Sequence, residues 1–319
     1  MKLFVAICTL SILNLSCMQP CKVQDPLKEQ ALTELRTVLK NNAMWVKVHA
    51  AEYLVWLHQD INDVQKVYEE EYRQYQNEPK YRIGISRVLY QTETDPAKKK
   101  ACLDKVLTIF GDTTSPDRIH AAETLAKLKT SPAVLYPQAT DASLKDTSRI
   151  LQTYTLWATS YTSKEVEEKN KQEFIRMAFE DADPIIRKIS AYVLLKSKDL
   201  TPGEWESFAA KALEEPASGG LRNNLLQAAF VTYTGGDETI HQKIKTEITS
   251  NWKQFNAGER IELAQALAEK GGCKDAVILA AFLNNEENNN LYDAQSPSGA
   301  DVRAAAAYAI LKIAGRASK

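Results

Sequence analysis

The sequence lacks the short motifs that mark the common enzyme classes. Its 319 residues contain no phosphate-binding loop, no dinucleotide-binding glycine pattern, no nucleophile elbow and no HExxH zinc motif. Four methionines are too few to line a hydrophobic groove, and the five cysteines show no CxxC or zinc-like spacing. We therefore predict a protein that is not an enzyme, with no catalytic residue, no metal site and no cofactor.

An excess of one charge is also missing. The chain has 40 Lys and Arg against 41 Asp and Glu, which gives a formal net charge of −1. A domain that binds nucleic acid carries a large basic patch, and none is evident here. We expect no nucleic-acid partner, and we interpret the short run Lys98-Lys99-Lys100 as a solvated helix face.

The N-terminus has an apolar segment, Leu3 to Leu15, that is too short to span a bilayer. It follows Lys2 and leads into Leu15-Ser16-Cys17, which resembles a bacterial lipobox. The resemblance implies a signal peptide over residues 1–16, lipidation of Cys17, and a tether over residues 17–26. No Asp follows at the position that retains lipoproteins in the inner membrane. The expected location is thus the bacterial cell envelope, as an outer-membrane lipoprotein; ordinary secretion or an uncleaved anchor are the alternatives.

A helical phrase recurs along the rest of the chain, most clearly as DADPIIRKISAYVLLK at residues 181–196. Asp183 is a good N-cap, and Pro184 suits the first helical position because its missing N–H is not needed there. Apolar residues then follow at helical spacing. Taking the basic residue of each copy as a marker gives Lys47, Arg82, Arg118, Arg149, Arg187, Arg222, Arg260 and Arg303. The steps between them are 35, 36, 31, 38, 35, 38 and 43 residues, a period typical of an α-solenoid with two helices per unit.

The D-x-x-V-R-x-x-A-x-x-x-L phrasing resembles HEAT repeats, including the short bacterial kind found in phycobilisome-lyase-like proteins. The resemblance covers residues 27–315. It implies an all-α fold, a right-handed α-α superhelix of about eight helical hairpins. We expect one continuous, elongated domain, in which Cys102 and Cys273 lie too far apart to pair and are small buried residues.

One column of the repeat is polar or aromatic throughout. Five residues after each basic marker stand Glu52, Arg87, Glu123, Tyr154, Tyr192, Gln227, Gln265 and Tyr308. Core positions would be apolar, so this column is predicted to line the concave surface, where solenoids bind partners.

Two identical HAAE tetrads add histidine to this face, at His49 in the first inner helix and His120 in the third. The position two residues after the marker lies on the same helix face as the one at five. In the repeat between the tetrads that position is Gly84, which leaves a gap in the ridge. The predicted binding patch comprises Trp45, His49, Glu52, Arg87, His120, Glu123, Tyr154 and Tyr192.

Three interpretations of the tetrads remain open: repeat packing, a recognition patch for a glycan or peptide, and a metal site. Histidine and glutamate can ligate zinc or iron, and HEAT-like deoxyhypusine hydroxylases hold a di-iron centre with His-Glu pairs. Two repeat steps separate the tetrads by about 20 Å, too far for one ion. We therefore predict a lipid-anchored envelope scaffold that binds a protein or glycan partner through its concave face. The alternative is a metal-dependent envelope enzyme, or enzyme accessory, that uses the paired His and Glu residues.

Overall fold

The computed structural model describes residues 22–217, 220–284 and 299–317, and these residues form helices, turns and loops without a strand. The prediction of an all-α fold is confirmed. Residues 1–21, which include Cys17, the predicted signal peptide and part of the predicted tether, lie outside the described residues, as do residues 285–298.

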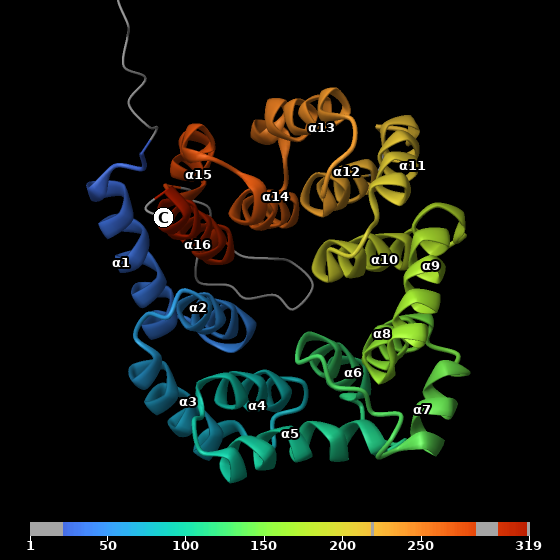
Figure 1. Ribbon diagram of the computed structural model, residues 1–319. Coiled ribbons are helices and arrows are strands. Elements are labelled where there is room, and N and C mark those ends of the chain that lie inside the picture. The colour runs from blue at the N-terminus through green and yellow to red at the C-terminus, as the bar shows by residue number, and fades with distance from the viewer. Residues whose placement is uncertain (1–21, 218–219, 285–298, 318–319) are drawn as a thin grey trace, which may run out of the picture.

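The helices are arranged as two concentric rings, and the chain alternates between them (Figure 1). The outer ring consists of α1 (Asp25–Asn41), α3 (Ile61–Tyr75), α5 (Pro96–Gly111), α7 (Pro137–Leu144), α9 (Lys164–Glu180), α11 (Pro202–Glu214), α13 (Glu238–Ser250) and α15 (Ala276–Leu283). The inner ring consists of α2 (Met44–Trp56), α4 (Tyr81–Thr92), α6 (Arg118–Lys127), α8 (Arg149–Thr159), α10 (Pro184–Ser197), α12 (Leu221–Thr232), α14 (Ala257–Lys270) and α16 (Gly299–Ala317). Three short 3₁₀ turns, Ser160–Thr162, Trp252–Gln254 and Cys273–Asp275, complete the described helical elements.

Local sequence sets the helix boundaries. The Asp183 side chain accepts a hydrogen bond from the Ile185 N–H, as expected of an N-cap before Pro184. Thr201 forms a full capping box with Glu204 at the start of α11. The helical array begins at Asp25 and ends at Ala317, two residues beyond each of the boundaries predicted from the repeat.

The array is closed rather than elongated, because the last inner helix packs against the first repeat. α16 lies beside α1, α2, α14 and α15 (Figure 1). The run Ala304 to Ala307 is fully buried, and its small side chains let helices approach α16 from both sides. The expectation of an elongated domain is therefore wrong: the last repeat buries its faces against the first instead of ending in a capped edge.

The same type of ion pair, between the basic marker of an inner helix and a glutamate of the neighbouring repeat, links successive repeats and also closes the ring. The Lys47 ammonium of α2 lies 2.5 Å from the Glu71 carboxylate of α3, the outer helix of the next repeat. Corresponding pairs join Arg222 to Glu247 at 2.5 Å and Arg187 to Glu215, just beyond α11, at 2.6 Å. At the seam Arg303 of α16 lies 2.6 Å from Glu34 of α1. α1 thus takes the place of the outer helix that would follow α16.

The cysteines differ from the prediction of small buried thiols. Cys273 is disulfide-bonded, and Cys102 is a partly buried free thiol. Burial raises the pKa of the Cys102 thiol, so it is a weak nucleophile at neutral pH.

None of the helices in the described ranges combines the length and the apolar character that crossing a bilayer requires.

Candidate functional site: the central cavity

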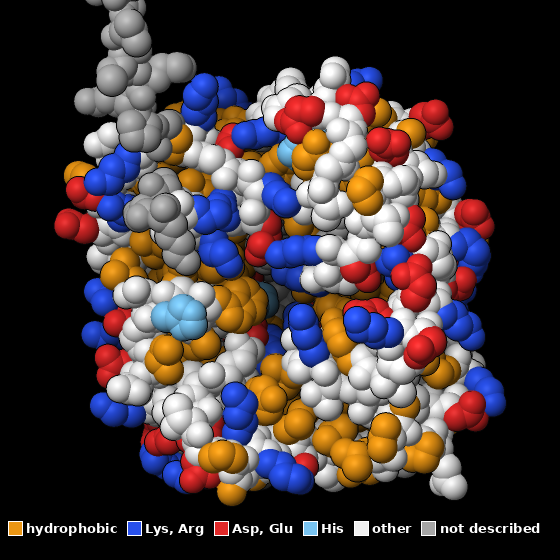
Figure 2. Space-filling view, in the orientation of Figure 1, with side chains coloured by type: hydrophobic (Ala, Val, Ile, Leu, Met, Phe, Trp, Pro, Cys, Tyr) orange, Lys and Arg blue, Asp and Glu red, His pale blue; other side chains and the backbone are white. Residues whose placement is uncertain are grey.

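The inner ring encloses a cavity of about 310 Å³. Its wall is built from α2, α6, α8, α10, α12 and α14, so side chains from six of the eight repeats meet there. Figure 2 shows the molecule hollowed at the centre of the ring, with Lys and Arg side chains around the hollow. A cavity of this size is in the range that accommodates a small molecule or a few sugar units.

One side of the cavity is an aromatic cluster at the seam of the ring. The Tyr53 ring of α2 stacks on the Tyr308 ring of α16, with centroids 4.7 Å apart. Trp56 meets both rings edge-on, at 5.7 Å from Tyr53 and 5.8 Å from Tyr308. Trp56 remains 41% exposed, which is unusual for so large a side chain and makes its indole available to a ligand.

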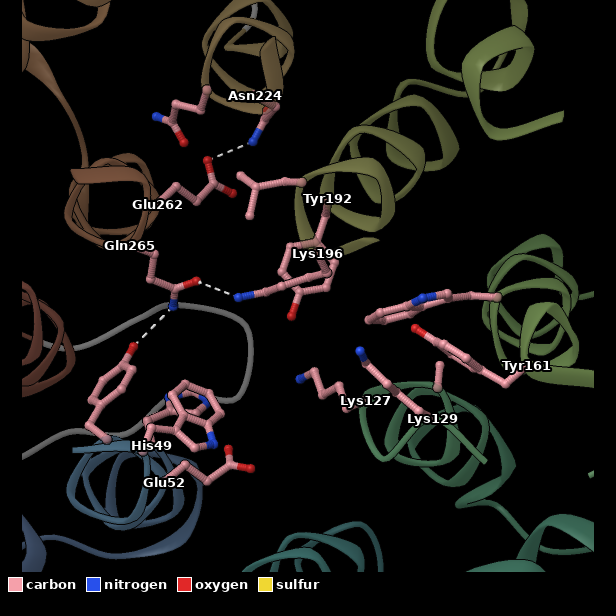
Figure 3. A pocket seen from close by; sticks show the side chains of 16 residues that line it. His49, Glu52, Lys127, Lys129, Tyr161, Tyr192, Lys196, Asn224, Glu262 and Gln265 are labelled. Atoms are coloured by element: carbon pink, nitrogen blue, oxygen red, sulfur yellow. Dashed lines mark hydrogen bonds between the residues drawn. The ribbon is translucent and has the colours of Figure 1, made fainter. Parts of the chain in front are cut away.

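A second group of aromatics lines the cavity from α8 and α10. The Trp157 and Tyr192 rings meet edge-on with centroids 5.8 Å apart. The Lys196 ammonium lies over the Tyr192 ring at 5.3 Å from its centroid, a cation–π contact. Aromatic surfaces therefore lie on two sides of the cavity, and polar side chains fill the wall between them (Figure 3).

Gln265 of α14 connects two parts of the wall (Figure 3). Its amide nitrogen donates to the Tyr53 hydroxyl at 3.0 Å, and its amide oxygen accepts from the Lys196 ammonium at 3.4 Å. The amide thus holds the Tyr53 hydroxyl and the Lys196 ammonium in fixed positions in the wall.

Glu262 is a carboxylic acid in the wall whose pKa is raised. Its carboxylate accepts a hydrogen bond of 2.6 Å from the Asn224 amide, and it faces the cavity (Figure 3). Burial raises the pKa of Glu262 to about 7, helped by the nearby charge of Glu259 and opposed by Lys188 and the Asn224 hydrogen bond. Near neutral pH this carboxyl therefore exists in both protonation states.

Glu52 has the opposite environment on the other side of the cavity. The Arg87 guanidinium binds it through two hydrogen bonds, Nε to Oε1 at 2.6 Å and Nη2 to Oε2 at 2.8 Å. Burial alone would raise the pKa of Glu52, but the charge and hydrogen bonds of Arg87 outweigh it and lower the pKa to about 2. Glu52 is thus a permanently ionised but neutralised part of the wall.

The structure distributes the predicted binding residues over three environments. His49, Glu52 and Tyr192 line the cavity. Arg87 and Glu123 lie behind the wall, where Arg87 binds Glu52 and Glu123 binds Lys127 at 2.8 Å. The remaining three, Trp45, His120 and Tyr154, are partly buried packing residues outside the cavity.

The gap that was expected at Gly84, between the two HAAE tetrads, is filled by packing. Trp45 contacts the His120 ring at 5.3 Å between centroids and also covers the gap at Gly84. His49 instead points to the seam, where its Nδ1 lies 2.9 Å from the Asp301 carboxylate. The two histidines have separate partners, and within the described residues no group of three His, Cys, Asp or Glu side chains has metal-binding geometry.

Some residues that line the cavity were absent from the predicted binding patch, although the repeat pattern could have identified them. Positions nine residues after the basic marker share a helix face with those at five, one turn further along. This column supplies Trp56, Lys127 and Lys196 to the cavity and Lys312 to the adjoining one. Asn224 and Glu262, two residues after their markers, line it as well.

Comparison with known proteins assigns no relative. No family model, no curated protein and no solved structure matches the chain.

Proposed function

We propose that this protein is a lipid-anchored component of the bacterial cell envelope that binds a glycan in its central cavity. In this proposal the chain is a HEAT-like array with right-handed α-α connections, and its concave surface has become the inside of the ring. The observation that carries the proposal is the central cavity with aromatic rings on two sides and amides between them. A scaffold role for the outer surface is compatible with this site.

The closed ring favours a glycan over a folded protein partner. An open solenoid can receive a domain on its concave side, whereas a cavity of about 310 Å³ holds only a few sugar units or a side chain. A pyranose has an apolar C–H face and a rim of hydroxyl groups. The exposed Trp56 indole matches the face, and the amides of Asn224 and Gln265 match the hydroxyls.

The contacts give less support to the alternative, a metal-dependent enzyme that uses paired His and Glu residues. His49 is paired with Asp301, and His120 packs on Trp45. Glu52 and Glu123 are likewise engaged, with Arg87 and Lys127 respectively. These His and Glu side chains would have to lose their present partners before they could bind a metal ion together.

The envelope location is supported by the lipobox-like start and by one covalent feature. Cys273 is disulfide-bonded, and structural disulfides persist in oxidising compartments such as the periplasm. Metabolic labelling with palmitate tests the anchor: label incorporated by the wild type and lost in Cys17→Ala supports it. Equal label in both, or none in the wild type, would refute lipidation at Cys17.

A glycan array probed with the purified full-length protein tests the binding function. The informative variant is Trp56→Ala, and the matched control is Tyr75→Ala, since Tyr75 is 39% exposed and lies on the outer ring away from the cavity. The proposal predicts glycan signals for wild type and Tyr75→Ala that Trp56→Ala loses at least tenfold, with unchanged helicity. Absence of any glycan signal for the wild type, or equal signals for all three proteins, would contradict it.

A further inference from the structure

We propose that the ligand of the cavity is an acidic glycan whose carboxylate groups are bound by Lys129 and Lys196. This inference rests on the proposed glycan-binding function and adds the chemical class of the sugar. It follows from the charges of the cavity wall, from the direction of its lysine side chains, and from the shape of the space beside Trp56.

The charges of the wall do not cancel. Among the charged side chains that line the cavity, Glu52 is neutralised by Arg87 and Lys127 by Glu123. Two cations then remain, because Lys129 and Lys196 form no ion pair within the described part of the chain. A cavity with two uncompensated ammonium groups attracts an anion and disfavours a cation.

The acidic side chain that could offset these cations is only partly ionised. Burial raises the pKa of Glu262 to about 7, with Glu259 adding to the rise and Lys188 and Asn224 opposing it. In its protonated form Glu262 is a hydrogen-bond donor as well as an acceptor. It can then donate to a ligand oxygen instead of repelling it.

The two unpaired lysines point into the same space from different parts of the ring. Figure 3 shows Lys129, just beyond α6, and Lys196 of α10 with their ammonium ends in the cavity. A hydrogen bond from an ammonium to a carboxylate is charge-assisted and stronger than one between neutral groups. A ligand carboxylate would gain such hydrogen bonds in this part of the cavity.

The space beyond Lys196 accommodates the rest of the sugar chain. A second cavity of about 240 Å³ adjoins the first and shares Trp56, Lys196 and Gln265 with it. Its wall also contains the Tyr308 ring, with the Lys312 ammonium 5.5 Å from the ring centroid, and Glu269, whose carboxylate is paired with the Lys198 ammonium at 2.5 Å. Together the two spaces form an extended site with aromatic surface along it and lysines in both parts, which suits an oligosaccharide with repeated negative charges.

The test compares each acidic sugar with its own neutral ester. Isothermal titration of the full-length protein uses tri-uronates (galacturonate, glucuronate and mannuronate) and their methyl esters, which keep the skeleton and remove the charge. The variants are Lys129→Met and Lys196→Met, and Lys98→Met on the exposed face of α5 is the control. A sulfated trisaccharide and inorganic phosphate distinguish a carboxylate site from a general anion site.

The inference predicts that at least one tri-uronate binds the wild type and Lys98→Met at least tenfold more tightly than its ester. Lys129→Met and Lys196→Met should each lose tenfold or more in affinity for that tri-uronate, with unchanged circular dichroism. Equal binding of acid and ester, or binding of a neutral array glycan without any uronate, overturns the acidic-sugar inference and leaves glycan binding intact. Tighter binding of the sulfated sugar or of phosphate overturns the carboxylate assignment. No binding by any glycan contradicts both proposals.

Discussion

At the scale of single residues, the wall of the cavity separates two glutamates by their surroundings. Glu52 is held ionised by Arg87, and Glu262 is kept near its point of half-protonation by burial. The sequence predicted that both Glu52 and Arg87 belong to the concave face. It could not predict that the pair is buried, since a polar column looks the same whether its members face solvent or one another.

The Arg87–Glu52 pair gives the first prediction. Arg87 is 1% exposed, so Arg87→Met would leave Glu52 buried and unpaired and should lower the free energy of unfolding by about 3–5 kcal/mol. Urea denaturation at pH 7 measures this. Because the pKa of Glu52 is lowered to about 2, the stabilisation is present above its unfolded value near 4.5 and is lost as pH falls toward 2.

The matched control for this prediction is Arg36→Met, which breaks an exposed pair with Asp60 and should cost less than about 1 kcal/mol. The double variant Glu52→Leu/Arg87→Met should recover much of the loss, because no unpaired charge remains. An Arg87→Met variant as stable as Arg36→Met would show that the buried pair is not formed.

Glu262 gives a prediction of opposite sign. Its folded pKa of about 7 lies above the unfolded value, so the folded state binds the extra proton and stability falls as pH rises from about 4.5 through 7. Glu262→Gln removes this dependence and should be more stable than the wild type at pH 8, by at most about 3 kcal/mol. Thermal or urea unfolding between pH 5 and pH 8 measures the difference.

A wild-type stability that stays flat or rises over that pH range, relative to Glu262→Gln, would contradict the buried position of Glu262. Glu69→Gln is a suitable control, because Glu69 is exposed on α3. It should leave both the stability and its pH dependence close to those of the wild type.

At the scale of helices, the recurring sequence pattern predicted where an inner helix begins. The N-cap at Asp183 and the Pro after it predicted the start of α10 at Pro184. The pairing of the markers with carboxylates of the next repeat was not predicted, because the acidic partner lies at different spacings, 24 residues on for Lys47 and 28 for Arg187. The packing of the helices, rather than a fixed sequence motif, determines which glutamate pairs with each marker.

Gly84 allows a prediction about helix packing. A Cβ at this position would lie 2.8 Å from Val48 Cγ2 and 3.1 Å from the Trp45 ring, so α2 and α4 approach closely there. Gly84→Ala should therefore destabilise by about 1–3 kcal/mol despite its better helix propensity. Chemical denaturation measures the change.

Gly203 in the first turn of α11 is the matched control, because a Cβ there meets no atom within 4 Å. Gly203→Ala should be neutral or stabilise by up to about 1 kcal/mol. If both alanine variants were neutral, the close approach at Gly84 would be refuted.

At the scale of the whole molecule, the sequence predicted eight helical hairpins but not their closure. The period shows that neighbouring repeats pack alike, whereas closure depends on the small rotation between them, accumulated over the ring. The cavity depends on that closure, because Tyr308 and Gln265 reach Tyr53 and Trp56 only when α16 lies beside α2 and α14 beside α16. The column of polar residues could be predicted, but not the enclosed space it lines.

The seam gives a prediction that separates local from global opening. Tyr308→Ala removes the ring stacked on Tyr53 and should weaken the seam by about 3 kcal/mol. Amide hydrogen exchange should become roughly a hundredfold faster in α1 and α16, while α8 on the far side of the ring serves as the internal control and changes little (Figure 1). Equal acceleration in all three helices would mean that the seam does not open on its own.

Small-angle X-ray scattering of the protein in solution tests the closed ring most directly. A closed ring should give a radius of gyration near the roughly 20 Å expected of a compact chain of this length. An open row of eight helix pairs would extend about 80 Å, at about 10 Å per packed layer, and would give a distinctly larger radius and a long tail in the distance distribution. The compact value, with a distance distribution that shows the central hollow, is the predicted result. The extended distribution would contradict the ring, and with it the enclosed cavity on which both proposals depend.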